Sequence, residues 1–347
     1  MNAPSSIRSE RYRSLGRITL DRPNALNAIN PDMAHEIMNT LNDWRDDPGV
    51  LRVVIASSSP RAFCAGGDIK ALRHIIATQG PDVAHAAMCV PYDAMLAIAH
   101  YPKPIITLLD GITMGGGVGL GAHARHRVVT ERAVLAMPET AIGLTPDAGG
   151  SWLLVRSPAP YGLRNALLGC RMHGSQAVHM GFADHFMSSA RLASLVEHLA
   201  ECPQSTEGKQ LSAMSESLPP FKDEDSPAVL SAFTASAPLS PHTGLNELFH
   251  RLSHLEDETA DRDLAQLRNA CPFSLHVTWR IQQILKASPH TLDEAFALET
   301  RAVRHLIARA DFSEGVRARM VDKDNAPRWQ PQTIEDVSSE EIEACLT

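Results

Sequence analysis

The 347-residue sequence contains no run of eighteen apolar residues, which argues against a membrane-spanning helix. Its six cysteines are scattered without a CxxC pair, a spacing that favours reduced thiols over a disulfide framework. The amino-terminal stretch has no apolar segment of the kind found in secretory signals. A formal net charge of −8 argues against a nucleic-acid-binding surface. We therefore expect a cytoplasmic protein without a membrane or nucleic-acid partner.

Several catalytic and binding signatures are also missing. No serine lies in a G-x-S-x-G sequence, so the nucleophile turn of α/β-hydrolases is not predicted. The glycine cluster that starts at Gly111 has the spacing GxxxGGGxG and lies in mid-chain, which disfavours a dinucleotide-binding loop. His123 and His126 have a spacing that could bind a metal ion. Because no cysteine or carboxylate ligand pattern accompanies them, ordinary surface or capping roles are favoured.

The first half of the chain alternates between strand-like and helix-like segments. Apolar and β-branched runs predict strands over 16–20, 51–56, 104–109, 127–130 and 133–137. Helices are predicted from Pro31, with Asn30 as the N-cap, from Asp68, and over 83–100. Repeated strand-then-helix order predicts a largely parallel sheet covered by helices.

The strand signals stop near Ala190. Residues 203–245 are rich in Ser, Pro and Glu and predict a loop-bearing insert. Helices are predicted over 273–286 and, after a capping box that starts at Thr291, to about residue 310. The expected organisation is a core over 1–190, a variable helical and loop insert over 191–270 and a helical C-terminal region over 271–347.

Two glycine-rich segments follow predicted strands. Ala62-Phe-Cys-Ala-Gly-Gly-Asp-Ile69 is by itself most simply a tight turn, although its small residues would let a ligand approach backbone N–H groups. In Gly111-Ile-Thr-Met-Gly-Gly-Gly-Val-Gly-Leu120, glycines at a helix start leave N–H donors unpaired with the helix dipole behind them. Such a site favours a phosphate or a developing oxyanion.

A third segment, over residues 136–150, carries two carboxylates in a loop framed by Gly and Pro. Glu139 follows a proline at a strand end, and Asp147 precedes Ala-Gly-Gly. Carboxylates in such loops usually serve as turn or cap residues. Beside an oxyanion-binding segment, however, a carboxylate can deliver a nucleophile or move a proton.

These segments, together with the sequence LDRPNALNA at residues 20–28, resemble the crotonase (enoyl-CoA hydratase/isomerase) superfamily in order and spacing. The wording PETAIGLxPDxGG and the C-terminal sequence DFSEGVRARMVDKDNAPRW resemble its 3-hydroxyisobutyryl-CoA hydrolase branch. The resemblance runs from about residue 15 to 335 and is weak only over 200–265. It implies an α/β crotonase-like spiral of ββα units with a helical C-terminal region.

The resemblance also implies roles for individual residues. The backbone N–H groups of Ala65 and Gly116 would form the oxyanion hole, Glu139 matches the catalytic glutamate, and Asp147 would meet the acyl hydroxyl or orient water. The residues implied in binding the coenzyme A part of the substrate are Asn24, Ala25, Leu26, Ala62, Ala65, Gly66, Gly67, Asp68, Gly115 and Gly116.

Two departures from the family pattern bear on the reaction. Hydratases carry a second glutamate at the position of Gly119, so hydration lacks one of its proton carriers. Glu139 alone can serve hydrolysis, either as a nucleophile or as a base for water. Hydrolases of the branch usually carry a glutamate where this chain has Pro91, before Tyr92, and Asp93 lies one residue beyond. The sequence therefore does not specify which acyl group the enzyme prefers.

The sequence thus predicts hydrolysis of a short-chain 3-hydroxyacyl-CoA, with 3-hydroxyisobutyryl-CoA and valine breakdown foremost. The alternatives are a hydratase or isomerase of the same superfamily and a non-catalytic acyl-CoA-binding protein. No metal or redox cofactor is expected, because coenzyme A enters with the substrate. The resemblance is compatible with a trimer, a hexamer or a monomer.

Overall fold

The computed structural model describes residues 6–202, 206–221, 226–236 and 243–347. The chain forms two compact units, each assembled from three stretches of sequence. The first unit contains residues 1–68, 87–136 and 171–221, and the second contains 69–86, 137–170 and 222–347. Segments of the first and second units therefore follow one another in turn along the sequence. The expected division into core, insert and C-terminal region stays a prediction.

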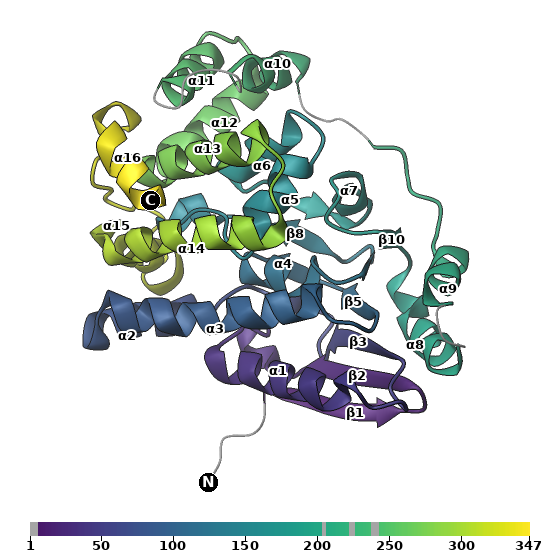
Figure 1. Ribbon diagram of the computed structural model, residues 1–347. Helices are drawn as coiled ribbons and strands as arrows, with labels where there is room; N and C mark the ends of the chain where they lie inside the picture. Colours follow the sequence, from purple (N-terminus) through teal and green to yellow (C-terminus); the bar gives the residue numbers. More distant parts are fainter. Residues whose placement is uncertain (1–5, 203–205, 222–225, 237–242) are drawn as a thin grey trace. The chain divides into compact units, whose positions relative to one another are not determined.

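A six-stranded sheet forms the centre of the first unit (Figure 1). Its strands, in spatial order, are β1 (Ile7–Tyr12), β2 (Leu15–Leu20), β3 (Arg52–Ser57), β5 (Ile105–Leu109), β7 (His126–Val129) and β10 (His185–Phe186). β2, β3, β5, β7 and β10 pair in parallel, and β1 pairs antiparallel with β2. Parallel strands of this kind are usually buried on both faces, in line with their apolar sequences.

A smaller sheet in the same unit carries the glycine-rich segments. It contains β4 (Ala62–Cys64), β6 (Ile112–Met114), β8 (Val134–Ala136) and β9 (Met172–His173). The first three are parallel, and β9 is antiparallel to β8. The prediction of largely parallel sheets is confirmed.

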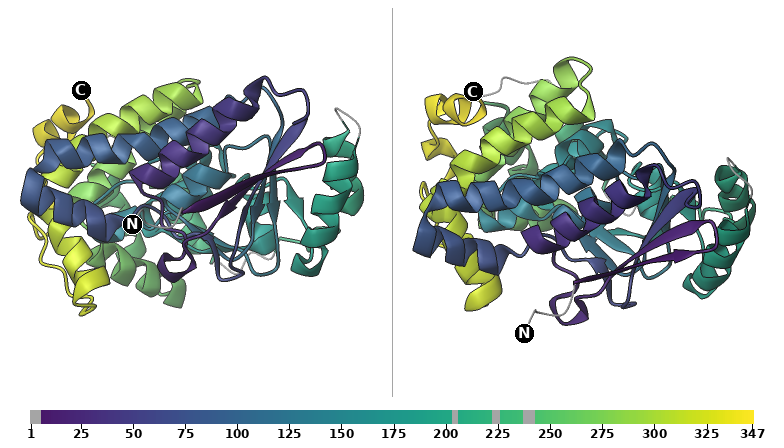
Figure 2. Two further views of the ribbon diagram at one scale, coloured as in Figure 1. Left: turned by 90° about the horizontal axis from the view of Figure 1, so that it is seen from below. Right: turned by 60° about the horizontal axis from the view of Figure 1, so that its bottom comes forward.

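Helices of the first unit pack against both of its sheets. They are η1 (Pro23–Ala25), α1 (Pro31–Arg45), the second half of α3 (Pro81–Ala99), α4 (Gly116–Gly121), α7 (Gly174–His179), η3 (Ser189–Arg191), α8 (Leu192–Glu201) and α9 (Glu207–Met214). Asn30 caps α1 as predicted, its side chain accepting from the Met33 amide. Side chains of α8 and α9 share an apolar core with those of β2, β3, β5 and β7, and both helices lie beside the sheet in Figures 1 and 2.

One expectation for the first unit requires correction. No strand was predicted over residues 7–12, where β1 forms, because its sequence IRSERY is mostly polar and its burial pattern is mostly exposed. Its order comes from pairing with β2. Within the insert, which was expected to mix helices and loops, α9 lies in the first unit. Leu218–Phe221 has no regular structure, and the second proline-rich stretch of that region, which begins at Pro238, lies outside the described residues.

The second unit is helical in the described part of the chain. Its elements are α2 (Ile69–Gln79), the start of α3, η2 (Glu139–Ile142), α5 (Gly150–Arg156), α6 (Tyr161–Leu168), α10 (Pro227–Ser236), α11 (Gly244–Ser253), α12 (Glu258–Asn269), α13 (Pro272–Ala287), α14 (Leu292–Ala308), α15 (Ala310–Val316), a π-helical turn (Arg317–Val321), η5 (Ile334–Asp336) and α16 (Ser339–Leu346). Thr291 and Glu294 form the predicted capping box of α14. An apolar cluster around Phe233, Leu248, Leu264 and Trp279 joins α10 to α13.

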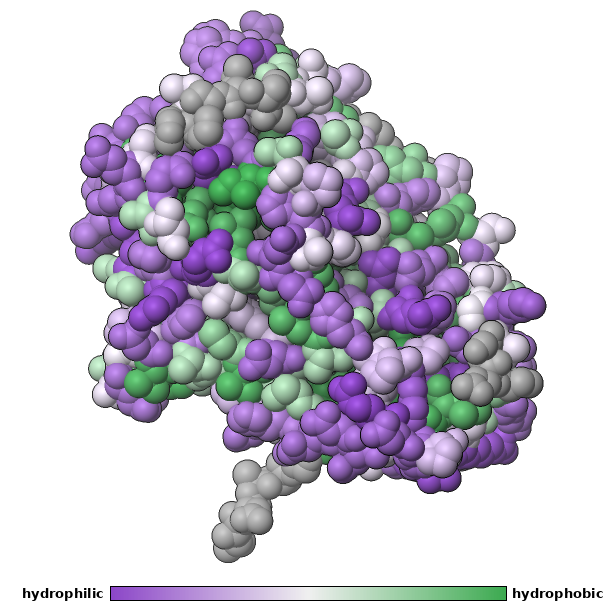
Figure 3. Space-filling view, viewed as in Figure 1, coloured by the Kyte–Doolittle hydropathy of each residue, from purple (hydrophilic) through white to green (hydrophobic). Residues whose placement is uncertain are grey.

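Hydrophilic side chains predominate on the face drawn in Figure 3, between smaller hydrophobic patches. Three large hydrophobic residues of the described chain are exposed: Val83, Leu218 and Val321. Among the helices that the structure describes, none combines the length and apolar character needed to cross a bilayer.

Candidate functional site

The amide of Ala65 lies at the end of β4, where an oxyanion donor was expected. It donates instead to the carbonyl of Leu26 at 3.0 Å. An N–H group held by a carbonyl is not open to a substrate oxygen, so the structure contradicts the assignment of Ala65 as a donor. Its bond to Leu26 ties the η1 loop to β4.

Gly67 is the better-placed donor in this segment. Its neighbours are paired with Ile29, whose amide donates to the Gly66 carbonyl at 2.8 Å and whose carbonyl accepts from Asp68 at 2.9 Å. The Gly67 N–H itself has no partner among the described residues. A Cβ at Gly116 would lie 3.3 Å from the Gly67 nitrogen, so the first residue of α4 approaches this amide closely.

Glycine is required where α4 crosses β4. A Cβ at Gly117 would stand 1.9 Å from the Cys64 carbonyl oxygen, which no side chain tolerates. Gly66 has φ +112°, a value that favours glycine. Gly115 donates its N–H to Ala136 at 3.0 Å and so fixes the turn before α4. The small residues noted in the sequence therefore bring two backbone segments together.

The side chain of Asn27 anchors the η1 loop. It is fully buried, and its amide nitrogen donates to Ser57 Oγ at 2.7 Å and to the carbonyls of Ala62 and Phe63 at 3.2 and 3.0 Å. The sequence reading did not single out this anchoring role. The signal in the sequence was the second asparagine of LDRPNALNA, Asn27, which recurs three residues after Asn24 among small and apolar residues.

The expected coenzyme A-contacting residues on this loop differ in exposure. Asn24 and Ala25 are exposed and Leu26 is half-buried. Asp68 forms an ion pair with Arg22 at 3.1 Å, so its carboxylate is partly neutralised. These residues lie in the same unit as Gly67 and Gly116, and their role in binding stays a prediction.

The two predicted carboxylates lie in the second unit. Glu139 opens η2 directly after Pro138 and is 6% exposed, and its Oε2 has no hydrogen-bond partner among the described residues. The Thr140 hydroxyl donates to the Leu167 carbonyl at 2.9 Å, and the Cys271 amide donates to the Thr140 carbonyl at 2.9 Å. These bonds fix the short helix, so Glu139 is a buried acid on a rigid support.

Asp147 is 4% exposed and lies in the turn that leads into α5. Its carbonyl accepts from the Gly150 amide at 2.7 Å. Ala148 and Gly149 both have left-handed backbone conformations, with φ +55° and +75°. Such a conformation is uncommon for alanine, so the surrounding contacts must hold this turn.

A third buried acid, Glu299 of α14, was missed in the sequence. It is 1% exposed and accepts from the amides of Gly149 at 2.7 Å and Ser151 at 2.9 Å. A signal was present, because Glu299 lies on the apolar face of its helix with Ala295, Ala302 and Val303 at helical spacing. An acid on such a face is expected to be buried and therefore to need a hydrogen-bond donor inside the protein.

The three acids influence one another. Burial raises the pKa of the Glu139 carboxyl well above its ordinary range, and the neighbouring Asp147 and then Glu299 raise it further. Burial also raises the pKa of Glu299, to about 8, although the amides of Gly149 and Ser151 favour its charged form. An acid with a raised pKa is suited to accept and return a proton near neutral pH.

The C-terminal signature supports the helix that carries Glu139. A Cβ at Gly315 of α15 would lie 2.6 Å from the Ile142 carbonyl carbon, and one at Gly143 would lie 2.8 Å from Asp311. Both glycines let α15 lie directly against η2. Arg317, which follows α15, is paired with Glu314, Asp322 and Asp324.

The departure at Pro91 lies within α3, which continues through it. Pro91 and Tyr92 are buried, whereas Asp93 is exposed. The carboxylate at position 93 therefore does not replace the missing one at position 91.

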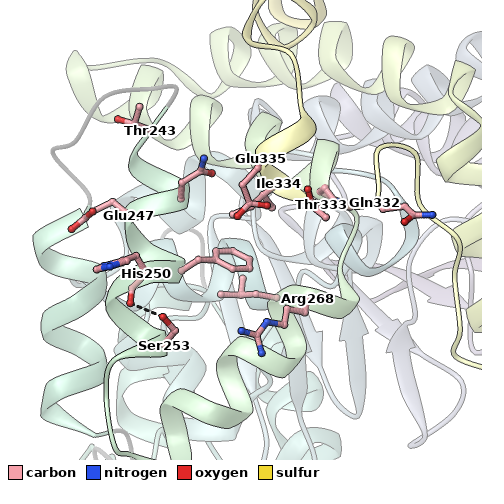
Figure 4. Close-up of a pocket in the computed structure, with 13 residues that line it drawn as sticks. Thr243, Glu247, His250, Ser253, Arg268, Gln332, Thr333, Ile334 and Glu335 are labelled. Atoms are coloured by element: carbon pink, nitrogen blue, oxygen red, sulfur yellow. Dashed lines mark hydrogen bonds between the residues drawn. The ribbon is translucent and has the colours of Figure 1, made fainter.

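A separate cavity of about 900 Å³ lies in the second unit, between α11, α12 and the segment before η5 (Figure 4). Its lining includes Glu247, His250, Arg268 and Glu335, and the Ser253 hydroxyl donates to the His250 carbonyl at 2.8 Å. None of the three acids is among its described lining residues. The carboxylate site is thus distinct from this cavity.

Comparison with known proteins gives a consistent picture. A sequence profile described as enoyl-CoA hydratase/isomerase matches residues 15–346. The chain is 36% identical over 334 residues to the mitochondrial 3-hydroxyisobutyryl-CoA hydrolase of Xenopus laevis, and the match covers 96% of this chain and 86% of that relative.

Two solved structures are similar over nearly the whole chain. A crystal structure named as an enoyl-CoA hydratase from Rhodobacter sphaeroides 2.4.1 has a TM-score of 0.85 and 38% identity, covering 99% of this chain and 97% of that one. A structure named as a carnitinyl-CoA dehydratase from Mycobacterium thermoresistibile has a TM-score of 0.87 and 29% identity, with the same coverage. The similar proteins thus carry names of a hydrolase, a hydratase and a dehydratase.

Proposed function

Because the chain belongs to the enoyl-CoA hydratase/isomerase family, we propose that it hydrolyses the thioester of a short-chain 3-hydroxyacyl-CoA, with 3-hydroxyisobutyryl-CoA as the foremost substrate. The crotonase-type α/β fold expected from the sequence is confirmed. The Xenopus relative, named as a hydrolase of that substrate, supports the choice of acyl group.

One observation carries the proposal. Glu139 is a buried acid with an unpaired oxygen and a raised pKa, while the position expected to hold a second glutamate in hydratases is Gly119. Adding water to a double bond requires a base for water and an acid for the α-carbon. Hydrolysis of a thioester requires only one activated oxygen and a stabilised oxyanion. The residue set of this chain therefore favours hydrolysis.

In the proposed reaction, the amides of Gly67 and Gly116 donate to the thioester oxygen as it gains negative charge. Two routes deliver the new oxygen. Glu139 removes a proton from water, which attacks the carbonyl carbon, or it attacks directly and forms an anhydride that water then opens. In both routes the carbon–sulfur bond breaks, and the sulfur leaves with a proton as free coenzyme A. Water supplies one oxygen of the acid product.

Fewer residues of this chain determine the identity of the acyl group than determine the reaction type. Asp147 can accept a hydrogen bond from a 3-hydroxyl group. Its negative charge raises the pKa of the Glu139 carboxyl, and this interaction with the catalytic acid supports a role for Asp147 at the acyl end of the substrate. Asp93 is exposed and Pro91 carries no charge. We therefore place recognition of the hydroxyl on Asp147. Neither a metal nor a redox cofactor is part of this reaction.

The competing function is hydration of an enoyl-CoA, which the name of the Rhodobacter structure favours. The two are separated by following free thiol from 3-hydroxyisobutyryl-CoA and the loss of enoyl absorbance from crotonyl-CoA with the same enzyme. Thiol release with slow hydration supports the hydrolase. Rapid hydration without thiol release would overturn it, and binding without either reaction would indicate an acyl-CoA-binding protein.

A further inference from the structure

Glu299 is joined to the turn that carries Asp147 through both of its carboxyl oxygens. Oε2 accepts from the Gly149 amide at 2.7 Å and Oε1 accepts from the Ser151 amide at 2.9 Å. All these residues belong to the second unit. The two bonds lie two and four residues beyond Asp147, so Glu299 holds the chain directly after this acid.

Other contacts hold the turn before and after the same point. Thr145 Oγ1 lies 2.9 Å from Thr278 Oγ1 of α13, and Gln282 of α13 donates to the Ser151 carbonyl at 3.2 Å. The Ser151 hydroxyl donates to the Pro146 carbonyl at 2.7 Å. Both ends of the turn are therefore tied to the rest of the unit. Between them lie Asp147 and the left-handed residue Ala148.

Anchoring the turn with a buried acid costs free energy, because burial disfavours the negative charge of a carboxylate. Glu299 is 1% exposed, and burial in the presence of Asp147 opposes its negative charge. A neutral side chain could tie the turn at a lower cost. A carboxyl group, however, offers two oxygens to two converging amides and, once ionised, also acts electrostatically on the acids nearby. The arrangement fits a residue that controls both the position and the protonation of its neighbours.

We propose that Glu299 is a positioning residue, which holds the 147–151 turn through the amides of Gly149 and Ser151 and so aligns Asp147 beside Glu139. This inference rests on the proposed function, in which Glu139 and Asp147 serve thioester hydrolysis. Glu299 does not itself touch the substrate. Its effect passes through the backbone and through charge.

The titratable groups around Glu299 lie on the helices that pack against α14. The charge of Asp147 raises the pKa of Glu299, and the charge of Glu299 raises the pKa of Glu139. The other titratable side chains on the packed helices are Arg156 of α5, His276, Arg280 and Lys286 of α13, Asp311 and Glu314 of α15, and Glu340, Glu341, Glu343 and Cys345 of α16. Of these, Arg280 pairs with Glu343, Asp311 and Glu341 pair with Arg309, and Glu314 pairs with Arg317.

The test compares Glu299→Gln with Asp263→Asn in the full chain. Glutamine keeps the shape but offers only one acceptor, so one of the two amides loses its partner. Asp263 is a matched control, because it is 1% exposed and accepts two bonds from Arg164, at 2.7 and 2.9 Å, away from the turn. Both variants are expected to unfold at lower temperature than the wild type.

Kinetics separate positioning from general stability. With Glu299→Gln we expect kcat for thioester hydrolysis to fall about tenfold or more, while KM changes by less than about threefold. The acidic limb of the kcat profile should move to lower pH, since loss of the nearby negative charge lowers the pKa of Glu139. Asp263→Asn should leave kcat and the limb unchanged. A Glu299→Gln enzyme with wild-type kcat and pH profile would overturn the inference.

Amide hydrogen exchange tests the inference without reference to the reaction. In Glu299→Gln, the peptide that covers residues 145–156 should exchange faster than in the wild type, and in Asp263→Asn it should not. If the wild type releases no thiol but this exchange difference is found, the proposed function fails while the anchoring role stands. Unchanged exchange in Glu299→Gln would overturn the anchoring role even in an active enzyme.

Discussion

Gly315 of α15 lies so close to Ile142 of η2 that an added Cβ would stand 2.6 Å from the Ile142 carbonyl carbon. The contact is with backbone on both sides, so neither partner can yield by rotating a side chain. Since η2 begins at Glu139, the C-terminal signature determines how firmly this acid is held.

Gly315→Ala should therefore lower the free energy of unfolding by about 1–3 kcal/mol, the usual cost of forcing an added carbon into a packed interior. Turnover should fall with it, because α15 and η2 must separate. Denaturant unfolding and the thiol assay measure both. Gly208→Ala is the control, since the nearest atom to its new Cβ is the His126 ring at 3.5 Å, and it should change neither quantity appreciably. Wild-type stability in Gly315→Ala would show that the contact is not tight.

Glu139→Gln should leave acyl-CoA binding nearly intact and nearly abolish turnover. The glutamine side chain has almost the same shape, but it can neither attack a carbonyl nor accept a proton. Binding is measured by calorimetry with a non-hydrolysable thioether analogue, and turnover by thiol release. Turnover close to that of the wild type would remove Glu139 from the mechanism.

Gly116→Pro should reduce kcat by about two to three orders of magnitude, the usual scale for the loss of one oxyanion donor. Proline suits the first position of a helix, and Gly116 is the first residue of α4. Its Cβ would lie 3.3 Å from the Gly67 nitrogen, so the Gly67 amide must shift slightly to admit it. Gly67→Pro should have a similar effect. Thermal unfolding is the control, and a folded, fully active Gly116→Pro enzyme would contradict the assignment.

Ala65→Pro should behave differently from these two variants. It removes the N–H that donates to Leu26, so the expected result is a lower unfolding temperature caused by release of the η1 loop. If Ala65→Pro instead kept its unfolding temperature and lost only kcat, Ala65 would be the donor after all.

Stability should fall as the pH rises from about 4.5 towards 8. The pKa of Glu299 is raised to about 8 in the folded protein, so over this range it keeps a proton that it loses on unfolding. The unfolded state then binds fewer protons, and the free energy of unfolding decreases by up to ~1.4 kcal/mol per pH unit for such a group. Urea unfolding at a series of pH values measures this slope. Glu299→Gln should make it shallower, and an unchanged slope would contradict the raised pKa.

The sequence by itself determined the local elements and the family. Asn30 and Thr291 start their helices as predicted, because a cap depends only on residues within one turn. β-branched runs similarly determined β3 and β5, and the glycine-rich and acidic motifs identified the two segments that matter for chemistry. These features depend on neighbours in the chain, which the sequence contains in full.

Only the tertiary structure decided which groups are available for reaction. Whether Ala65 or Gly67 offers a free amide depends on the Leu26 carbonyl, nearly forty residues away in the chain. Glu299 reaches Gly149 across 150 residues, and no periodicity specifies that pairing. The raised pKa of Glu139 likewise comes from burial and from acids brought near by folding. A hydrogen-bond donor is free, and an acid keeps its proton, because of what folding places around it.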